Sequence, residues 1–595
     1  MRPESNEHRE RLPLGGLWEA APDLDDRGVA ASWGRGFAPL GPLAVPGSIN
    51  EQWAERGLRD TLGPFWLQRE IVVPAAARGR RARLHFPSAD LTARVWWDGV
   101  EVGANDAPFL PFDIDLGALV PGNRHRLVVR LDSRLPDTHP LPGIASADFH
   151  AEKRSGAEVF PPVRYDFFPF TGLHREPVLA FEPAVGLRTL QLRPGWSGTR
   201  GTLAVQAQVD AGIDALRLTL HGGEAAWVRE VDTAGAGDIV EALFDDLPVQ
   251  PWHPDAPHRY RLHVEASRGG EVVDAVERRL GFRDVRVEGA ALRLNGAPIT
   301  LRGFGLHEDF PVLGKGQCLA LTVKDFELMR WCGANSFRTS HYPYAEETLE
   351  LAEQLGFLVI SEIASVNLDF RRVTDATLAQ HRAQLERLVA RDGERACVIA
   401  WSLTNEPGYL AESAYAERAP AYFEALFAHA RTLDPSRPLT AANVGSRHGL
   451  IDPLYAHCDF LSLNRYLGWY EMPAQLDAAV DALRAELDAL AAHFPGKPIL
   501  FTEFGADAVA GMHSTVPQLF TEEYQADFIA RYWRLIAAHP QCFGGHVWNL
   551  ADFRTAQHFR RVVLNHKGVF TRTRDPKAAA WRLRKLWRGL GPGDC

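Results

Sequence analysis

The stretch VIAWSLTNE, residues 398–406, is an apolar run that ends in the amide of Asn405 and the carboxylate of Glu406. Its length and its β-branched and aromatic content are typical of a buried β-strand. A carboxylate at the mouth of such a strand is either badly placed or placed for chemistry. The fold of the chain therefore depends on whether this strand has partners that end in the same way.

Short apolar stretches of the same kind occur on both sides of it: ITLRGFGLH, ANSFRTSHY and FLVISEIAS before it, and LTAANVG, FLSLNRYLG, ILFTEFGAD and GGHVWNLAD after it. Helical patterns lie between most of them, for example TVKDFELMRWCG and QLDAAVDALRAELDALAAHF. Eight strand–helix alternations over about 300 residues are the arrangement of a (β/α)8 TIM barrel. The alternative, an open doubly wound sheet, usually carries a glycine-rich dinucleotide fingerprint, which this segment lacks.

The residues before the barrel have a different texture. Segments such as RARLHFPSAD, HRLVVRLDS and YRLHVEASRGGEVVD alternate apolar and polar residues, and Gly, Pro and Asp interrupt them, as in antiparallel sheets. A strand-rich stretch of about 100 residues has the size of an immunoglobulin-like sandwich. We therefore predict three domains: a jelly-roll-like β-sandwich (1–183), an immunoglobulin-like β-sandwich (184–284) and a TIM barrel (285–595).

Composition limits what the chain binds and where it works. A net charge of −10 argues against nucleic acid or a membrane surface as a partner. The six cysteines include none in the first 317 residues and no CxxC pair, so we expect no zinc site, no disulfide framework and a reducing, cytoplasmic compartment. The sequence contains no recognisable secretory signal and no apolar run long enough to span a membrane.

Glu406 and Glu503 each follow an apolar strand, and in a barrel they face each other across the mouth. Paired carboxylates at such a site indicate glycoside hydrolysis. One stays protonated and donates to the leaving oxygen, while the other attacks the anomeric carbon or activates a water. Two surface salt-bridge partners are the alternative interpretation. Arg338, near the end of the second strand, either keeps Glu503 ionised by its charge or forms an ordinary salt bridge.

Longer motifs connect the chain to a known family. WSLTNEP and TEFGAD resemble the acid/base and nucleophile motifs of glycoside hydrolase family 2. VPGSINEQWAE, DFFPFTGLHR, GFGLHED, SFRTSHYPYAEE, LNRYLGWY and VWNLADFRT are similar to segments of the β-glucuronidases in that family, especially bacterial ones. The similarity runs from about residue 12 to about residue 588. It implies that the first sandwich is of a sugar-binding type and that the barrel is catalytic.

The resemblance implies a retaining exo-glycosidase that hydrolyses β-D-glucuronides to D-glucuronate and an aglycone. Glu406 is then the acid/base and Glu503 the nucleophile, with carboxyl groups about 5–5.5 Å apart. Glu406 needs a raised pKa, and a nearby ionised carboxylate supplies part of that rise. Side chains supply all of this chemistry, so we expect no cofactor and no metal. Members of the family are often tetrameric, which implies a homo-oligomer, either a tetramer or a dimer.

Basic residues beyond the eighth strand suggest that the sugar is a uronic acid. The segment FRRVVLNHKGVFTRTR contains Asn565 and Lys567, which match the Asn-x-Lys motif that holds the substrate carboxylate in β-glucuronidases. Lysine suits this role as a compact charge with rotatable donors. The resemblance implies a substrate-binding set, with His307 and Arg338 in support, that comprises Asp166, His341, Asn405, Tyr466, Tyr470, Trp548, Arg561, Asn565 and Lys567.

Three alternatives remain open at this point. A β-D-galacturonidase keeps the carboxylate contacts and differs only at C4 of the sugar, and Tyr165, where some relatives have His, leaves that end of the site undecided. A neutral-sugar β-glycosidase such as a β-galactosidase makes Lys567 incidental. A carbohydrate-binding protein without turnover has no need of both Glu residues. The connection between EIASVNLDF and LAQHRAQLERLV is short, which predicts an open mouth for a small-molecule or oligosaccharide glucuronide.

Overall fold

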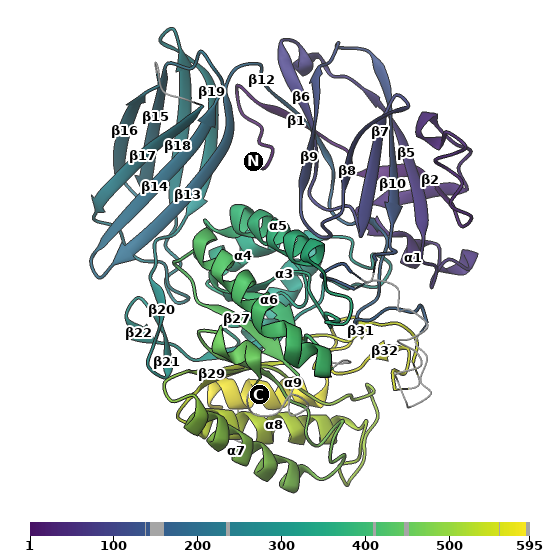
Figure 1. The fold of residues 1–595 in the computed structure, drawn as a ribbon, viewed down its shortest axis with the longest axis vertical. Coiled ribbons are helices and arrows are strands. Elements are labelled where there is room, and N and C mark those ends of the chain that lie inside the picture. The colour runs from purple at the N-terminus through teal and green to yellow at the C-terminus, as the bar shows by residue number, and fades with distance from the viewer. Residues whose placement is uncertain are drawn as a thin grey trace.

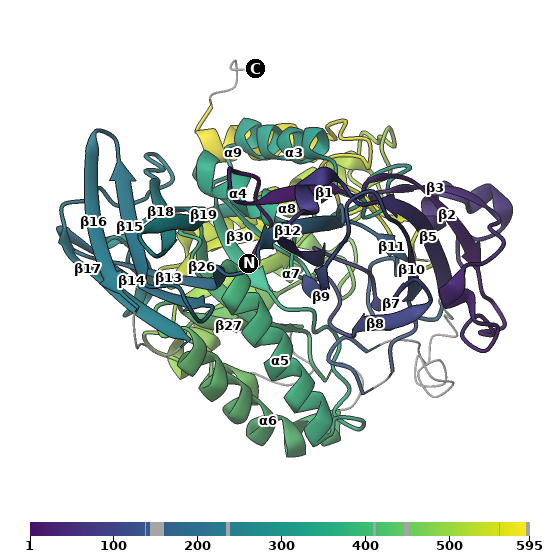
Figure 2. The ribbon, with the colours of Figure 1, turned by 90° about the horizontal axis from the view of Figure 1, so that it is seen from above.

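A computed structural model describes residues 1–136, 138–142, 160–233, 238–408, 412–444, 452–558 and 560–590. Two β-sandwiches lie side by side, and a barrel wrapped in helices lies below them in the view of Figure 1. Figure 2, the view from above, shows the sandwiches on opposite sides of the molecule, with the N-terminal segment between them. The predicted architecture of two sandwiches and a (β/α)8 barrel is confirmed.

The first sandwich consists of β1 (Glu10–Pro13), β2 (Gly16–Pro22), β3 (Gly41–Val45), β4 (Gly47–Ser48), β5 (Pro64–Val72), β6 (Arg80–Phe86), β7 (Thr92–Trp97), β8 (Val100–Asn105), β9 (Phe112–Ala118), β10 (Arg124–Asp132), β11 (Gly172–Leu173) and β12 (Val178–Pro183), with the short helix α1 (Ile49–Gln52). The sheet orders are β1-β12-β6-β9 and β3-β2-β5-β10-β7-β8, and β4 pairs with β11. The segment before β11 carries Asp166 and contacts the barrel domain, where Phe168 N donates to the backbone oxygen of Arg554.

The second sandwich consists of β13 (Leu187–Ser197), β14 (Arg200–Val209), β15 (Ala215–Gly222), β16 (Ala225–Asp232), β17 (Ile239–Leu247), β18 (Tyr260–Arg268) and β19 (Glu271–Leu280). Its sheets have the orders β13-β14-β17 and β16-β15-β18-β19. Along β14 exposed and buried residues alternate, and Leu203, Val205 and Ala207 enter the core between the sheets. This period of two is the pattern expected where one face of a sheet is buried.

A small sheet of β20 (Val285–Glu288), β21 (Ala291–Leu294) and β22 (Ala297–Pro298) leads into the barrel. The barrel strands are β23 (Leu301–Gly305), β24 (Ser336–Arg338), β25 (Leu358–Glu362), β26 (Val398–Asn405), β27 (Leu439–Asn443), β28 (Leu461–Asn464), β29 (Ile499–Phe504) and β30 (Cys542–Val547). They form a closed barrel in chain order, and β30 pairs in parallel with β23. Every residue of β26 is buried, which explains its nearly continuous apolar run.

The helices around the barrel are α3 (Leu319–Cys332), α4 (Glu346–Leu355), α5 (Asp375–Asp392), α6 (Glu412–Leu433), α7 (Leu476–His493), α8 (Glu522–Ala538) and α9 (Ala578–Arg588). Each of the eight predicted stretches overlaps one barrel strand, but most strands end earlier than predicted, and β30 begins two residues earlier. In FLSLNRYLG, for example, β28 ends at Asn464 and the following residues leave the sheet. Among them, Arg465 pairs with Glu486 of α7, and Tyr466 donates to Glu503 on the neighbouring strand β29.

Candidate active site

The ends of β26, β28 and β29 bring two carboxylates to the mouth of the barrel. Asn405 is the last residue of β26, and Glu406 follows it with a φ of 49°, a left-handed conformation that turns the chain out of the strand. Glu503 lies near the end of β29, in parallel register with Asn464 of β28. The strand alternation alone therefore places these side chains at one end of the barrel.

Three side chains hold the carboxylate of Glu503, which is 4% exposed. Arg338 Nη2 donates a hydrogen bond to Oε1, and Tyr466 OH donates to Oε2 at 2.5 Å. His341 Nε2 lies 3.6 Å from Oε1. These contacts fix the orientation of the carboxylate before any ligand binds.

Glu406 has a different set of neighbours and is partly exposed. Asn464 Nδ2 donates to Glu406 Oε1 at 2.8 Å and to Asn405 Oδ1 at 3.0 Å. Thr502 Oγ1 in turn donates to Asn464 Oδ1 at 2.7 Å, which fixes the orientation of this amide. Asn464 had no signal in the sequence beyond its place at the end of a strand, so sequence reasoning did not assign it a role.

Burial raises the pKa of both carboxyl groups. For Glu503 burial outweighs the lowering by Arg338, and with the nearby Glu406 it raises the pKa to about 8. For Glu406 burial also raises the pKa, against a lowering by the hydrogen bond from Asn464. The charge of Arg338 thus acts in the expected direction and favours the ionised form of Glu503, but desolvation is the larger effect on the pKa. The pair retains a proton near neutral pH, as acid catalysis by one member requires.

A third buried carboxylate, Glu362, lies at the end of β25 and was missed by sequence reasoning. Its Oε2 accepts hydrogen bonds from Arg338 Nη1 and Ser402 Oγ, both at 2.6 Å. Its Oε1 lies 2.7 Å from His341 Nδ1. The stretch FLVISEIAS carries the same strand-then-Glu signal as the two stretches that end in Glu406 and Glu503, so this residue could have been found.

Lys567 follows β32 (Leu564–Asn565), which pairs with β31 (Phe553–Arg554). Its side chain is 1% exposed, and Nζ donates to Tyr470 OH at 2.9 Å and to Asp507 Oδ2. Nζ also lies 5.7 Å from the ring centroid of Tyr466, whose hydroxyl donates to Glu503. One tyrosine therefore connects the ammonium with the carboxylate pair. Asp507, the last residue of the TEFGAD motif, is a partner that the sequence did not reveal.

Asp166 reaches this end of the barrel from the first sandwich. Its Oδ2 accepts from Arg561 Nη2 at 2.6 Å and from Asn565 Nδ2 at 2.9 Å. The same Arg561 nitrogen donates to Tyr470 OH at 2.9 Å. In this structure the amide of Asn565 thus binds Asp166. The sandwich residue Asp166 and the barrel residues Arg561, Asn565 and Tyr470 therefore form a single network of hydrogen bonds.

Trp548, directly after β30, is 3% exposed and forms an aromatic wall with two histidines. Its ring stacks on His341 with centroids 5.0 Å apart, and His307 meets its edge at 5.3 Å. A Cβ atom on Gly305 would lie 2.5 Å from Trp548 Cε3, so only glycine leaves room for the indole there. Burial lowers the pKa of His307 well below its usual value, and its Nδ1 lies 3.1 Å from Tyr342 OH.

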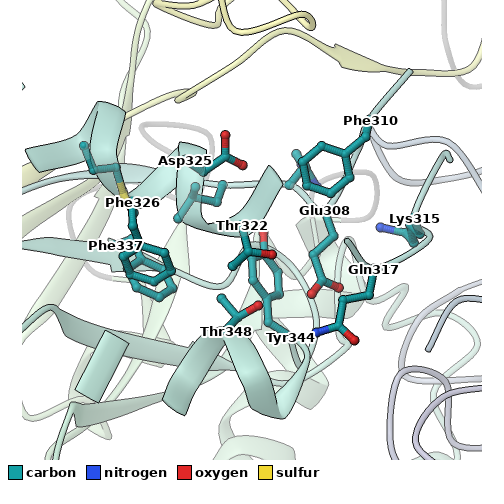
Figure 3. A pocket seen from close by; sticks show the side chains of 13 residues that line it. Glu308, Phe310, Lys315, Gln317, Thr322, Asp325, Phe326, Phe337, Tyr344 and Thr348 are labelled. Carbon is teal, nitrogen blue, oxygen red and sulfur yellow. The ribbon is translucent and has the colours of Figure 1, made fainter. Parts of the chain in front are cut away.

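The structure therefore brings the predicted site residues into two connected groups. One contains the carboxylates and surrounds Arg338, and the other surrounds Lys567; Tyr466 contacts both. His307 lies behind Trp548 rather than against either carboxylate. A separate cavity of about 30 Å³ has His307 in its lining. Its other lining residues include Glu308, Lys315 and Tyr344 (Figure 3). This cavity is far smaller than the usual ligand pocket of about 300 Å³ or more, so it does not accommodate a sugar.

Two family descriptions match the chain. "Glycosyl hydrolases family 2, TIM barrel domain" covers residues 285–591, and "Glycosyl hydrolases family 2" covers residues 185–283. The chain belongs to glycosyl hydrolase family 2. The family description thus spans both the barrel that carries the two carboxylates and the second sandwich, and the predicted family is confirmed.

Individual members of glycosyl hydrolase family 2 are similar over the whole chain. A β-glucuronidase of Paenibacillus borealis is 35% identical, with 99% of this chain and 98% of the relative covered. A β-glucuronidase of Sus scrofa is 32% identical, with coverages of 99% and 92%. The structure of a Ruminococcus gnavus β-glucuronidase in complex with D-glucuronic acid superposes with a TM-score of 0.87, at 33% identity and 99% coverage of both chains.

Proposed function

We propose that this chain hydrolyses β-D-glucuronides to D-glucuronate and an aglycone with retention of configuration. The observation that carries the proposal is the buried ammonium of Lys567, which shares Tyr466 with the carboxylate of Glu503. An ammonium has three donors, and Asp507 and Tyr470 engage two of them. The third suits the C6 carboxylate of a glucuronide, whereas the C6 hydroxymethyl group of a neutral hexose offers no charge to match.

In this mechanism Glu503 attacks C1 of the sugar and Glu406 gives its proton to the leaving oxygen. The resulting ester between sugar and Glu503 is hydrolysed by a water from which Glu406 removes a proton. Both displacements invert C1, so the product retains the original configuration. Tyr466 and Arg338 orient Glu503, and Asn464 orients Glu406. The carboxyl separation of about 5–5.5 Å remains a prediction.

The comparisons support the uronic-acid substrate. The relatives from Paenibacillus borealis and Sus scrofa are β-glucuronidases, and a structural neighbour binds D-glucuronic acid. They do not favour the galacturonidase or the β-galactosidase.

Among the described residues no cluster of three or more His, Cys, Asp or Glu side chains is arranged to hold a metal ion.

The test is a panel of p-nitrophenyl glycosides comprising the β-D-glucuronide, β-D-galacturonide, β-D-galactoside and β-D-glucoside. We expect kcat/KM to be highest for the glucuronide. A higher value for the galactoside or glucoside would overturn the proposed substrate, and a higher value for the galacturonide would move it to the C4 epimer. Product anomers followed by NMR report retention directly.

The proposal extends to the setting of the protein. We infer a cytoplasmic location in a bacterium, supported by the five free cysteines among the described residues. No helix in the described part of the chain is both long and apolar enough to cross a membrane. The homo-oligomer, a tetramer or dimer, is proposed from family resemblance. For the domains we retain 1–183, 184–284 and 285–595, supported by the limits of the two family matches.

A further inference from the structure

Asp166 lies on an extended connection of the first sandwich, yet it must reach a site built on the barrel. Its side chain is 47% exposed and is held from the barrel side by Arg561 and Asn565. In the described residues between 160 and β11 no helix or strand gives this connection a rigid backbone. Contacts on either side of Asp166 must therefore fix its position.

The first contact is an ion pair two residues before Asp166. Arg164 Nη2 donates to Asp369 Oδ2 at 2.7 Å, and both side chains are only 1% exposed. The neighbouring Asn367 Nδ2 donates to the backbone oxygen of Arg164 at 2.7 Å. Asp369 and Asn367 belong to the short connection between β25 and α5. This barrel loop therefore binds both the side chain and the backbone of Arg164 in the sandwich segment.

The second contact lies one residue after Asp166. The Phe167 ring faces Lys315 Nζ at 5.1 Å and the Tyr342 ring at 5.3 Å, and Lys315 Nζ lies 3.5 Å from the Tyr342 centroid. Lys315 comes from the loop after β23 and borders the small cavity of Figure 3. A cation held between aromatic rings attracts both, so this contact also joins the sandwich to the barrel.

We propose that Arg164, through its buried pair with Asp369, is a positioning residue that holds Asp166 at the sugar-binding site. The inference rests on the proposed function and on the substrate contact that the family resemblance implies for Asp166. Buried ion pairs are weak stabilisers because desolvation offsets their attraction. Their fixed geometry, by contrast, suits the placement of a carboxylate that no regular element supports.

The variant Arg164→Met tests this inference. Asp369 keeps Arg371 as a partner, with Nη2 at 2.7 Å, so the substitution does not leave its carboxylate unpaired. We expect kcat/KM for p-nitrophenyl β-D-glucuronide to fall about ten- to a hundredfold, mainly through KM, because a displaced binding group weakens substrate contacts. Arg164→Lys should recover part of the loss. Asn367→Ala, which removes the hydrogen bond to the Arg164 backbone oxygen at a residue with a φ of 52°, should raise KM less.

Arg9→Met is the matched control. Arg9 forms a buried pair with Asp274 through two hydrogen bonds of 2.7 Å, at the contact with the second sandwich and away from the carboxylates. It should lower the Tm without changing KM. An unchanged KM in both Arg164→Met and Asn367→Ala, or an equal KM increase in Arg9→Met, would overturn the inference.

A double-mutant cycle separates positioning from general damage. If Arg164 acts through Asp166, Arg164→Met should change KM less than about threefold in an Asp166→Ala background, because coupled residues are not additive. A full additive loss would overturn the inference. The turnover of the glucuronide by the wild-type protein is measured first. If the wild type does not hydrolyse the glucuronide, the proposed function fails; if it does, the double-mutant cycle tests the role of Arg164 alone.

Discussion

At the residue scale, the guanidinium of Arg338 has more carboxyl groups around it than its single charge can neutralise. Arg338 bonds both Glu362 and Glu503, and Glu406 adds a third carboxyl group nearby. Burial lowers the pKa of His341, so this ring does not supply a second permanent charge. Three carboxylates cannot all ionise around one buried cation without a large desolvation cost. This imbalance explains why the site retains a proton for the leaving group.

Glu503→Gln should lower kcat on the glucuronide by about a thousandfold or more, because an amide does not form the sugar ester. Steady-state rates with p-nitrophenyl β-D-glucuronide measure this loss. Glu406→Gln is the matched control. With a dinitrophenyl β-D-glucuronide as substrate it should still release dinitrophenol in a burst, since that leaving group needs no proton. A burst in Glu503→Gln and none in Glu406→Gln would reverse the two roles.

Lys567→Met should lower kcat/KM for the glucuronide at least about tenfold, because a charge-assisted contact of about 1.5–3 kcal/mol is lost. Activity on the corresponding glucoside should remain or rise. Lys497→Met is the control, since Lys497 Nζ donates to the backbone oxygens of Tyr455 at 2.6 Å and Cys458 at 2.9 Å and contacts none of the site residues. It should lower Tm and leave the glucuronide-to-glucoside ratio unchanged. The same ratio in Lys567→Met as in wild type would argue against carboxylate recognition.

At the element scale, strands position the site and helices provide the frame. β26 and β29 are fully buried, so the packing of apolar side chains around them fixes the carboxylates at their ends. α5 lies outside the barrel, and the residue before it, Thr374, caps it: the Thr374 hydroxyl accepts from Thr377 N in a capping box. The short connection before this helix carries Asp369, so the start of α5 limits how far that loop moves.

Thr374→Ala should destabilise the barrel by about 1 kcal/mol, because the first turn of α5 loses its cap. The change should lower the Tm slightly and leave kcat almost unaffected, which thermal unfolding and steady-state kinetics measure side by side. Thr374→Ser, which keeps the hydroxyl, should unfold like the wild type. If Thr374→Ser and Thr374→Ala unfold alike, the cap is not the cause.

At the scale of the whole molecule, the active site joins domains that are far apart in sequence. Asp166 from the first sandwich binds Arg561 and Asn565, which follow the last barrel strand. Arg9 from the N-terminal segment binds Asp274 of the second sandwich. Asp166 thus joins the network around Lys567 only when the first sandwich packs against the barrel. Groups that are buried or paired in this way titrate differently in the folded and the unfolded chain, so their pKa shifts make the stability depend on pH.

As the pH rises and Glu503 loses its proton, the free energy of unfolding of the chain should decrease. Its folded-state pKa of about 8 exceeds the ordinary value of 4.5, so its stabilising contribution is full below pH 4.5 and is lost as the pH rises through 8. Glu503→Gln cannot ionise, so its Tm relative to wild type should increase between pH 5 and pH 9. Differential scanning fluorimetry across this range measures the difference.

Asp434→Asn is the control for this pH dependence. Burial raises the pKa of Asp434, but the charge of Arg437 and the hydrogen bonds that the carboxylate accepts hold it below its usual value, so its contribution is lost only in acid. Its Tm difference from wild type should therefore stay constant from pH 5 to pH 9. A flat difference for Glu503→Gln as well would show that its carboxyl group is not raised on folding.

The sequence by itself determined the order of the domains and the approximate place of each barrel strand, but not the residue at which most strands end. Period-two segments specify half-buried sheets, and the continuous apolar runs specify strands covered on both faces. A Glu directly behind such a run must lie at the barrel mouth, so Glu406 and Glu503 could be named without coordinates. Glu362 obeyed the same rule and could have been named too.

Only the tertiary structure decided the partners and the protonation of these groups. Asp507 beside Lys567, Asn464 beside Glu406 and Asp369 beside Arg164 are pairs between distant segments, and no local pattern encodes them. The raised pKa of Glu503 depends on how completely the folded chain excludes water around it. Desolvation is a property of the packed molecule, so it cannot be read from the residues in order.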